Sequence, residues 1–232
     1  RQNKVCVIGN GVVVDPRILV EEIDMLRKAD IDVSSDNLKI SLLSHIIFPY
    51  HRNLDALREQ RRDQKIGTTG RGIGPCYVDK YSRSGIRLAE LLDPELLESR
   101  LRDNLKEKNP IFREAFGAGE FSFEEVYDEY MSYARTLAPF AVDTAQLLHD
   151  AKKTGKNILF EGAQGTFLDV DFGTYPFVTS SNTVSSNAAV GSGFSVSNIE
   201  KVIGVAKAYT TRVGEGPFPT ELTDAESCAL RD

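Results

Sequence analysis

The chain has 232 residues, of which 41% are hydrophobic and 27% are charged, and its formal net charge is −6. This length suits one large or two smaller α/β domains with a substantial core, and the acidic balance argues against a nucleic-acid-binding module. Three widely spaced cysteines, Cys6, Cys76 and Cys228, lack the spacing of a zinc site and indicate a reduced, cytoplasmic protein. We find no apolar run that could span a bilayer and no signal peptide.

The N-terminal quarter predicts a strand, a helix, a second strand and a second helix. Residues 4–8 (KVCVI) form an apolar, β-branched run that is typical of a buried strand. Asp15 followed by Pro16 is a helix N-cap, and apolar residues recur after it with helical spacing. Residues 38–48 (LKISLLSHIIF) predict the second strand, and a polar helix follows from Pro49 to Gln64.

The next stretch, residues 66–85 (IGTTGRGIGPCYVDKYSRSG), has the composition of an anion-binding loop. Its glycines permit positive φ values and a close approach of backbone N–H groups to a ligand. Hydroxyl and cationic donors accompany them at Thr68, Thr69, Arg71, Lys80 and Arg83. The pattern is neither a dinucleotide fingerprint nor a Walker loop. A flexible loop with solvated charges therefore stays open as an alternative.

The middle of the chain predicts helices. A short helix is expected at 86–92, a second one from 94 to about 109, and a longer helical region up to about 154. The boundary signals are Asp93, Ser122, Glu125, Pro139 and Gly155. We interpret residues 94–154 as a helical subdomain whose charges are solvated.

Polar, glycine-flanked segments follow in the last third. Residues 157–160 (NILF) predict a strand that leads into residues 161–166 (EGAQGT), where the Gln164 amide could bind a purine edge or brace the loop. The alternation in residues 168–171 places Asp169 and Asp171 on one face of a strand, and a solvated edge is favoured over a metal or general-base pair.

A hydroxyl-rich segment, residues 174–186 (TYPFVTSSNTVSS), comes next and precedes a short helix that glycines end. Thr179 and its neighbours could bind phosphate oxygens or cap that helix. Residues 199–213 predict a long last strand. None of the histidines has a catalytic neighbour in sequence, and structural roles are favoured for His45, His51 and His149. The basic run at 58–65 is interpreted as the solvated end of a helix rather than as a nucleic-acid contact.

Strands that alternate with helical segments predict an α/β fold with a mostly parallel sheet covered by helices. We expect residues 1–232 to form a single α/β domain in which 94–154 is the helical subdomain.

Four separated phrases resemble the adenylosuccinate synthetase family. They are GTTGRGIGP with a downstream DK and SRSG, then FEGAQG, GTYPFVTSSNT and AYTTRVGEGPFPTEL. The phrases stand in the family's order and extend over essentially the whole chain, although each one alone would be a weak signal.

The resemblance implies a GTP-dependent ligation in AMP biosynthesis. GTP phosphorylates the 6-oxygen of inosine monophosphate (IMP), and L-aspartate displaces that phosphate to give adenylosuccinate, GDP and phosphate. Phosphoryl transfer depends on positioning and charge neutralisation, in agreement with the lack of a visible Ser-His-Asp or Cys-His set. A cytoplasmic, Mg²⁺-dependent homodimer with no membrane or nucleic-acid partner is implied.

The resemblance also implies roles for individual residues. Thr69 and Thr179 match contacts to the IMP phosphate, and Gln164 matches the glutamine that bonds the hypoxanthine ring near its reacting oxygen. Arg83 matches an IMP-site arginine that reaches across the homodimer into the partner's nucleotide site. Arg71 and Lys80 match other positions near the substrates.

Several family features are missing from this sequence. These are the glycine-rich loop with the catalytic aspartate and lysine, the histidine acid, the aspartate-binding arginines and the guanine-specificity motif. The chain starts at Arg1 rather than at Met and is expected to be a central portion that is inactive alone, with Mg²⁺ and GTP bound mainly by missing segments. The alternative is a non-catalytic module for nucleotide binding or dimerisation.

Overall fold

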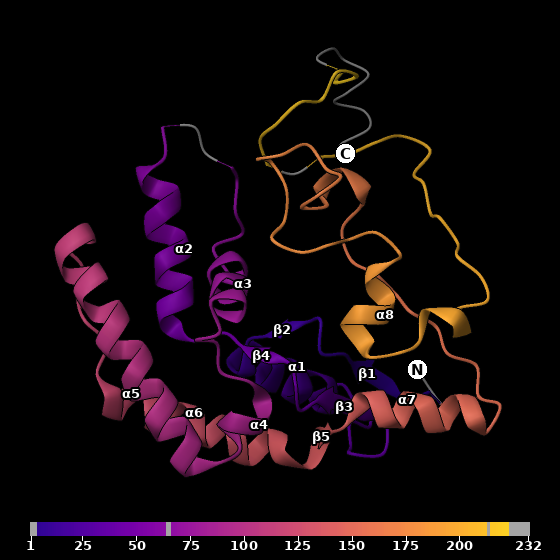
Figure 1. Ribbon diagram of the computed structural model, residues 1–232, viewed down its shortest axis with the longest axis horizontal. Coiled ribbons are helices and arrows are strands. Elements are labelled where there is room, and N and C mark those ends of the chain that lie inside the picture. The colour runs from indigo at the N-terminus through magenta and orange to yellow at the C-terminus, as the bar shows by residue number, and fades with distance from the viewer. Residues whose placement is uncertain (1–3, 64–65, 213, 223–232) are drawn as a thin grey trace.

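The computed structural model describes residues 4–63, 66–212 and 214–222. Two small sheets lie at its centre, and every pair of named strands is parallel (Figure 1). One sheet has the order β1-β3-β5 and the other pairs β2 with β4. The strand bounds are β1 (Cys6–Ile8), β2 (Val13–Val14), β3 (Leu38–Ser41), β4 (His45–Ile46) and β5 (Ala141–Val142). The predicted α/β class with a mostly parallel sheet is confirmed.

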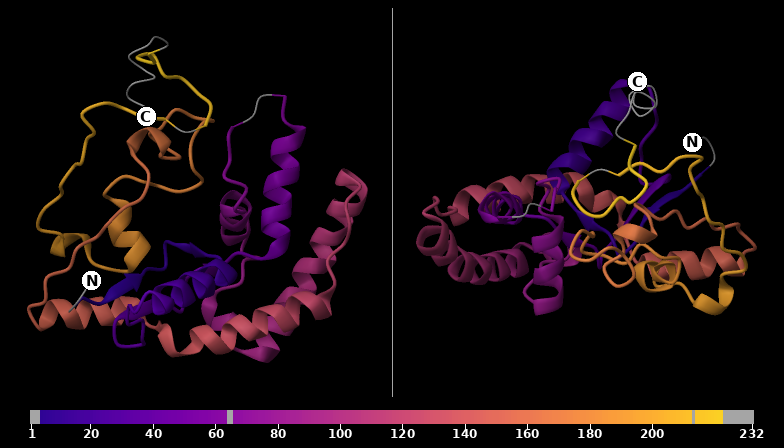
Figure 2. Two further views of the ribbon diagram at one scale, coloured as in Figure 1. Left: turned by 180° about the vertical axis from the view of Figure 1, so that it is seen from behind. Right: turned by 90° about the horizontal axis from the view of Figure 1, so that it is seen from above.

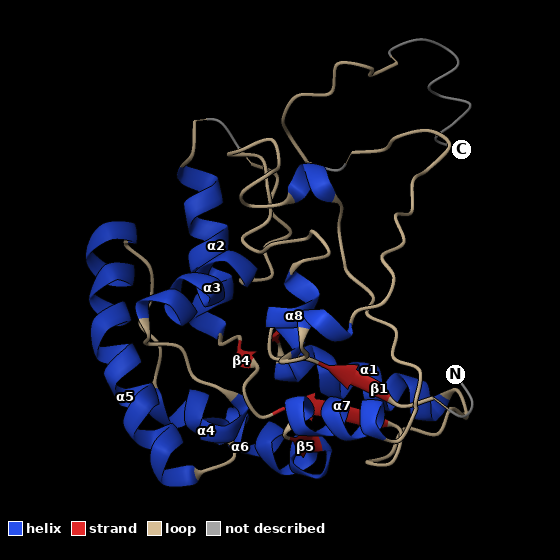
Figure 3. Ribbon diagram, turned by 45° about the vertical axis from the view of Figure 1, so that its right-hand side comes forward, coloured by secondary structure: helices blue, strands red, loops and turns tan. Residues whose placement is uncertain are grey.

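Helices surround these strands. Their bounds are α1 (Pro16–Lys28), α2 (Pro49–Arg61), α3 (Ile73–Ser82), α4 (Leu88–Leu91), α5 (Pro94–Pro110), η1 (Ile111–Phe116), α6 (Phe123–Leu137), η2 (Ala138–Phe140), α7 (Thr144–Lys153), η3 (Thr166–Leu168), α8 (Asn187–Ser192) and η4 (Val196–Asn198). Figure 2 shows α5 and α6 on one side of the molecule and the chain after α7 on the other. That later part consists mostly of loops (Figure 3). None of the helices in the described ranges is long and apolar enough to cross a membrane.

The predicted helix starts are explained by their caps. The Asp15 carboxylate accepts hydrogen bonds from the N–H groups of Arg17 and Ile18. In the same way, the Asp93 carboxylate accepts from the N–H groups of Glu95 and Leu96. Ser122 accepts from the Glu125 N–H. Each side chain thereby satisfies amides that a helix leaves without a partner in its first turn.

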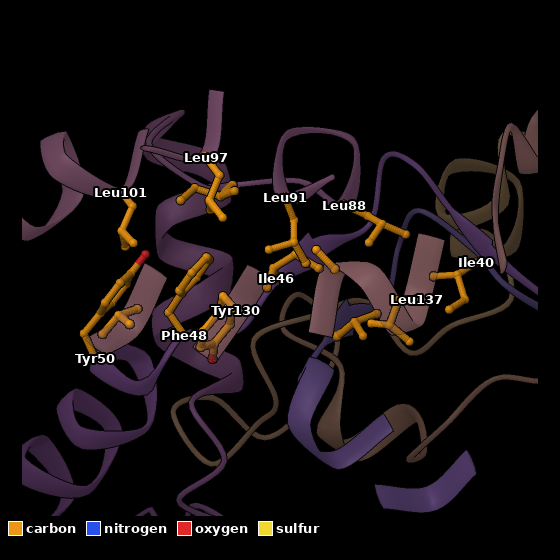
Figure 4. Close-up of a cluster of buried hydrophobic side chains, with 14 of the residues drawn as sticks. Ile40, Ile46, Phe48, Tyr50, Leu88, Leu91, Leu97, Leu101, Tyr130 and Leu137 are labelled. Carbon is orange, nitrogen blue, oxygen red and sulfur yellow. The ribbon is translucent and has the colours of Figure 1, made fainter. Parts of the chain in front are cut away.

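The core joins α2, α4, α5 and α6 to the strands. Its centre is a stack of aromatic rings, in which Phe48 lies 5.3 Å from Tyr50 and 4.2 Å from Tyr130 between ring centroids (Figure 4). The Tyr130 hydroxyl donates to the carbonyl of Ile47 at 2.7 Å, so that its polar end is satisfied inside the core. This packing holds the N-terminal end of α2, which begins at Pro49, in place.

The single strand expected at 38–48 is wrong, because this segment forms two strands in different sheets. Between β3 and β4 the chain turns, and the Ser44 N–H donates to the Ser41 carbonyl at 3.0 Å. The Ser44 hydroxyl also donates to the Gly9 carbonyl at 3.1 Å, which fixes the turn against the end of β1. Polar residues inside an apolar run were the available signal for this break.

The strands expected at 157–160 and 199–213 are not found in the described residues, and Val213 lies outside them. Residues 199–212 are mostly exposed, with Val205 at 95% of full exposure, whereas 157–160 alternates between exposed and half-buried positions, with Leu159 at 78%. A strand needs a neighbour that accepts and donates its backbone hydrogen bonds, and these runs have none within the described ranges. Apolar composition alone therefore overpredicted strands.

The predicted subdomain, residues 94–154, contains α5, η1, α6, η2 and α7. It also contains β5, which joins the central sheet by pairing with β3. The sequence does not predict this strand, because a two-residue run carries no periodicity. The division of the chain into domains stays a prediction.

Candidate functional site

The candidate loops gather beyond the carboxyl end of β1. The chain turns after Ile8, and the Gly11 N–H donates to the carbonyl of Gly191 in α8 at 2.7 Å. From the other side, the Tyr77 hydroxyl of α3 donates to the Gly11 carbonyl at 2.6 Å. This turn therefore anchors α3 and the segment around α8 at the edge of a parallel sheet where ligands of α/β proteins usually bind.

Contacts also join the phrases that were singled out in the sequence. A side chain at Gly74 in GTTGRGIGP would begin 3.1 Å from the hydroxyl oxygen of Ser180 in VTSSN. The Glu215 N–H in VGEGP donates to the Ile66 carbonyl at 3.4 Å, at the start of the glycine-rich loop. Segments separated by more than a hundred positions along the chain are thus in contact.

The glycine-rich loop itself lies against α2. A small pocket of about 290 Å³ opens between them, lined by Ala56, Glu59, Gln60, Thr68, Thr69 and Gly70. Thr69 and Arg71 are both exposed. The predicted donors of this loop are accessible to a ligand.

The segment that contains Thr179 is organised by Asp169, which has 0% of its surface exposed. One carboxylate oxygen accepts from the N–H groups of Asp171 (2.9 Å) and Phe172 (3.1 Å), and the other from those of Thr183 (2.6 Å) and Val184 (3.2 Å). Burial alone would raise the pKa of this carboxyl, but the four N–H groups outweigh it and hold the pKa well below its usual range.

The solvated strand edge expected for Asp169 is therefore wrong. Residues 166–168 form the short helix η3, and the carboxylate that follows it is a buried acceptor that closes the loop up to Val184. Asp171 is the exposed member of the pair and accepts from the Asn182 side chain. The alternation missed this difference because the donors come from residues up to 15 positions away.

Gln164 and Thr179 lie on the two loops that meet at this network. The Thr183 hydroxyl donates to the Gly165 carbonyl at 2.8 Å, next to Gln164, and the Thr179 N–H donates to the Leu168 carbonyl at 2.8 Å. Gln164 has a φ of +62°, a left-handed conformation that side chains rarely adopt. Such strained positions concentrate at functional sites.

Lys80 and Arg83 lie toward the opposite end of α3 from the glycine-rich loop, about 10 and 15 Å along the helix axis from Ile73. Arg83 is the C-cap of the helix and has a φ of +68°. Burial and the nearby Arg87 lower the pKa of Lys80. The structure thus does not bring Arg83 next to Thr69 within one chain.

Next to this end of α3 lies a buried ionic cluster that the sequence did not indicate. Asp79 accepts from His51 Nε2 at 2.8 Å and from Lys108 Nζ at 3.0 Å, through the same carboxylate oxygen. His51 Nδ1 accepts from the Phe48 N–H at 2.9 Å, which places the imidazole proton on Nε2. Burial lowers the pKa of His51, and the ring is neutral. The structural role expected for His51 fits this setting.

His45 is also buried, and burial together with Lys80 and Arg87 lowers its pKa to about 4.

Arg212, to which the sequence assigns no role, donates to the Thr174 hydroxyl and to the Phe177 carbonyl at 3.0 Å and so ties the last phrase to GTYPF. Its position inside TTRVGEG was the available signal. Within the described ranges, no group of three or more His, Cys, Asp or Glu side chains could hold a metal ion.

The fold is therefore of the parallel α/β class, and hydroxyl, amide and arginine donors beyond the end of a strand form a candidate ligand site at that edge. The family model described as adenylosuccinate synthetase matches residues 1–232. The chain belongs to the adenylosuccinate synthetase family.

Individual relatives agree with this assignment. The adenylosuccinate synthetase of Heliobacterium modesticaldum is 56% identical over 230 residues, which cover 99% of this chain and 53% of that protein. That of Thermoanaerobacter sp. strain X514 is 54% identical over 230 residues, covering 99% and 54%. The structure of fully ligated adenylosuccinate synthetase from Plasmodium falciparum is similar with a TM-score of 0.90 and 35% identity, over 100% of this chain and 53% of that one. The chain thus spans about half the length of the relatives it matches.

Proposed function

We propose that the protein to which this chain belongs joins L-aspartate to IMP at the expense of GTP, through 6-phosphoryl-IMP, and forms adenylosuccinate, GDP and phosphate. Membership of the family supports the reaction. The observation that carries the proposal to this chain is the contact between separated phrases, at Gly74 with Ser180 and at Ile66 with Glu215.

We propose the following roles for the site residues. Thr69 and Thr179 bind the phosphate of IMP through their hydroxyls, and Arg71 contributes positive charge beside them. Lys80, toward the other end of α3, acts elsewhere near the substrates. Gln164 bonds the hypoxanthine ring near its 6-oxygen, where preorganised donors stabilise the charge that develops in the transition state. Arg83 reaches the nucleotide site of a second copy in a homodimer, which suits its place at the far end of α3.

Residues 94–154 serve in this proposal as a helical subdomain of one α/β domain. GTP and Mg²⁺ are bound mainly by segments that this sequence does not include, and no step is assigned to Mg²⁺ on the side chains described. The protein acts in the cytoplasm. The 232-residue chain alone is inactive, since it spans about half the length of its relatives.

The direct test is an assay of adenylosuccinate formation from IMP, L-aspartate and GTP, followed by the absorbance change on amination of C6. The complete reading frame is expected to be active and the 232-residue chain inactive. A complete protein that binds IMP without forming adenylosuccinate would instead support the non-catalytic module. A complete protein that neither binds nor reacts would overturn the proposal.

Replacing Gln164 with alanine in the complete protein is expected to lower kcat by roughly 100-fold or more, because a donor near the reacting oxygen is lost. Gln146→Ala on α7 makes the same chemical change away from the site and should leave kcat unchanged. Steady-state kinetics with IMP as the varied substrate measure both. Equal rates for the two variants would remove Gln164 from the mechanism.

A further inference from the structure

Helix α2 presents two carboxylates to the glycine-rich loop. Asp55 and Glu59 are four residues apart, so both lie on one face of the helix, one turn from each other. The Gly72 N–H donates to Asp55 Oδ2 at 3.0 Å, and the Gly67 N–H donates to Glu59 Oε1 at 2.7 Å. The helix therefore holds the loop by the backbone amides at its two ends.

Both of these ends require glycine. Gly72 has a φ of +76°, and a Cβ on it would lie 2.8 Å from the backbone of His51 and Arg52 in α2. Gly67 has a φ of +79°, and a Cβ there would lie 2.7 Å from Gly214 Cα. The left-handed backbone and the close approach thus restrict to glycine the same two positions whose amides the carboxylates hold.

The four residues between these ends are exposed. Within the described ranges, no group accepts a hydrogen bond from the amides of Thr68, Thr69 or Arg71, whereas the Gly70 N–H donates to the Thr68 hydroxyl at 3.3 Å. Three amides thus remain for a ligand, together with the Thr69 hydroxyl and the Arg71 guanidinium. The two amides held by α2 are not among them.

We infer that Asp55 and Glu59 are positioning residues that hold the glycine-rich loop in its binding shape, so that Thr68, Thr69 and Arg71 present their donors to an anionic group. For the identity of that group, the phosphate of a purine mononucleotide, the inference rests on the proposed function. Preorganised donors need no reordering when the ligand arrives, which increases affinity.

The placement of Glu59 sharpens the inference. Its side chain lines the same pocket as Thr69, and its Oε2 is buried without a hydrogen-bond partner in the described part of the chain. A negative charge beside an anion site disfavours binding. Glu59 therefore favours anion binding through the hydrogen bond that it accepts from the loop, although its negative charge opposes that binding. Glu59→Gln, which keeps an acceptor for the Gly67 amide and removes the charge, should bind the anion at least as well as wild type.

The first test measures amide–water exchange by NMR in the complete protein without ligand. Asp55→Ala should raise the exchange rate of the Gly72 amide about tenfold or more, and Glu59→Ala that of the Gly67 amide, since alanine keeps the helix but removes the acceptor. Asp55→Asn and Glu59→Gln should retain most of the protection. Glu22→Gln, on the exposed face of α1, is the charge-matched control. Unchanged exchange in both alanine variants would overturn the inference.

The second test measures kinetics of the complete protein. The alanine variants should raise KM for IMP about tenfold and change kcat less than about twofold, because the loop binds the phosphate away from the reacting oxygen. Faster exchange with an unchanged KM would overturn the positioning role. A wild-type protein without any activity would refute the proposed function, while the exchange rates would still decide whether the two carboxylates hold the loop.

Discussion

Replacing Asp169 with alanine is expected to open the segment from 169 to 184 and to raise the Kd for IMP of the complete protein at least about tenfold. The carboxylate is the common acceptor for four backbone N–H groups and for the Asn182 side chain. Without it, these donors lose their partner in the interior, and the segment that carries Thr179 loses its defined shape. Limited proteolysis within 169–184 and binding of IMP by calorimetry measure the two effects.

Asp169→Asn is expected to be nearly as damaging as alanine. Both carboxylate oxygens face only donors, so the amide NH₂ of asparagine meets a backbone N–H in either orientation. Asp171→Ala is the matched control, because this exposed carboxylate lies two residues away and accepts from a single side chain. Similar proteolysis of the Asp169 and Asp171 variants would contradict the role assigned to the buried carboxylate.

The same carboxylate predicts a pH dependence. Its pKa is lower in the folded chain than in the unfolded chain, where an aspartate has a pKa of about 3.9. Its contribution to stability is therefore fully present above about pH 4 and is lost as the pH falls through the folded pKa. The difference in urea midpoint between wild type and Asp169→Ala should begin to shrink below about pH 4.

The sequence predicted the local features well because their causes are local. Asp15, Asp93 and Ser122 cap helices within three residues of themselves. The four phrases likewise identified the family, since each is a short pattern. What the sequence could not predict depends on partners far along the chain.

Two kinds of error show this limit. The apolar runs at 157–160 and 199–213 have strand composition, but a strand also needs a neighbour, and none lies beside them in the described ranges. Asp169 and Asp171 look equivalent in an alternating pattern, yet contacts from Thr183 and Val184 bury only one of them. In the sequence, Asp55 and Glu59 look like ordinary charged residues of a polar helix. Only the structure shows that they accept hydrogen bonds from the glycine-rich loop.

Replacing Asp79 with alanine is expected to lower the free energy of unfolding by about 3–5 kcal/mol, because it leaves a buried ammonium without its carboxylate. The side chains of His51, Asp79 and Lys108 are only 2%, 9% and 6% exposed. They come from α2, α3 and α5, so one carboxylate oxygen ties three helices together. Urea unfolding followed by circular dichroism measures the loss.

The pairing in this cluster can be separated from general damage to the core. Lys108→Met keeps an unbranched side chain of similar length and removes the charge, so the double variant with Asp79→Ala should be more stable than Asp79→Ala alone. Asp103→Ala, an exposed position on α5, should change stability by less than about 0.5 kcal/mol. A double variant as unstable as the sum of the two single variants would show that the ion pair contributes no coupling.

Loss of this cluster should also reach the candidate site, because Asp79 lies in the last turn of α3. Its backbone carbonyl accepts from the N–H groups of Ser84 and Gly85, the two residues that follow the left-handed Arg83. If Arg83 acts in a partner's nucleotide site, a loosened helix end lowers activity at temperatures where the fold persists. At such a temperature, the complete Asp79→Ala protein should lose activity that the double variant with Lys108→Met partly regains. Full activity in Asp79→Ala would separate the cluster from the placement of Arg83.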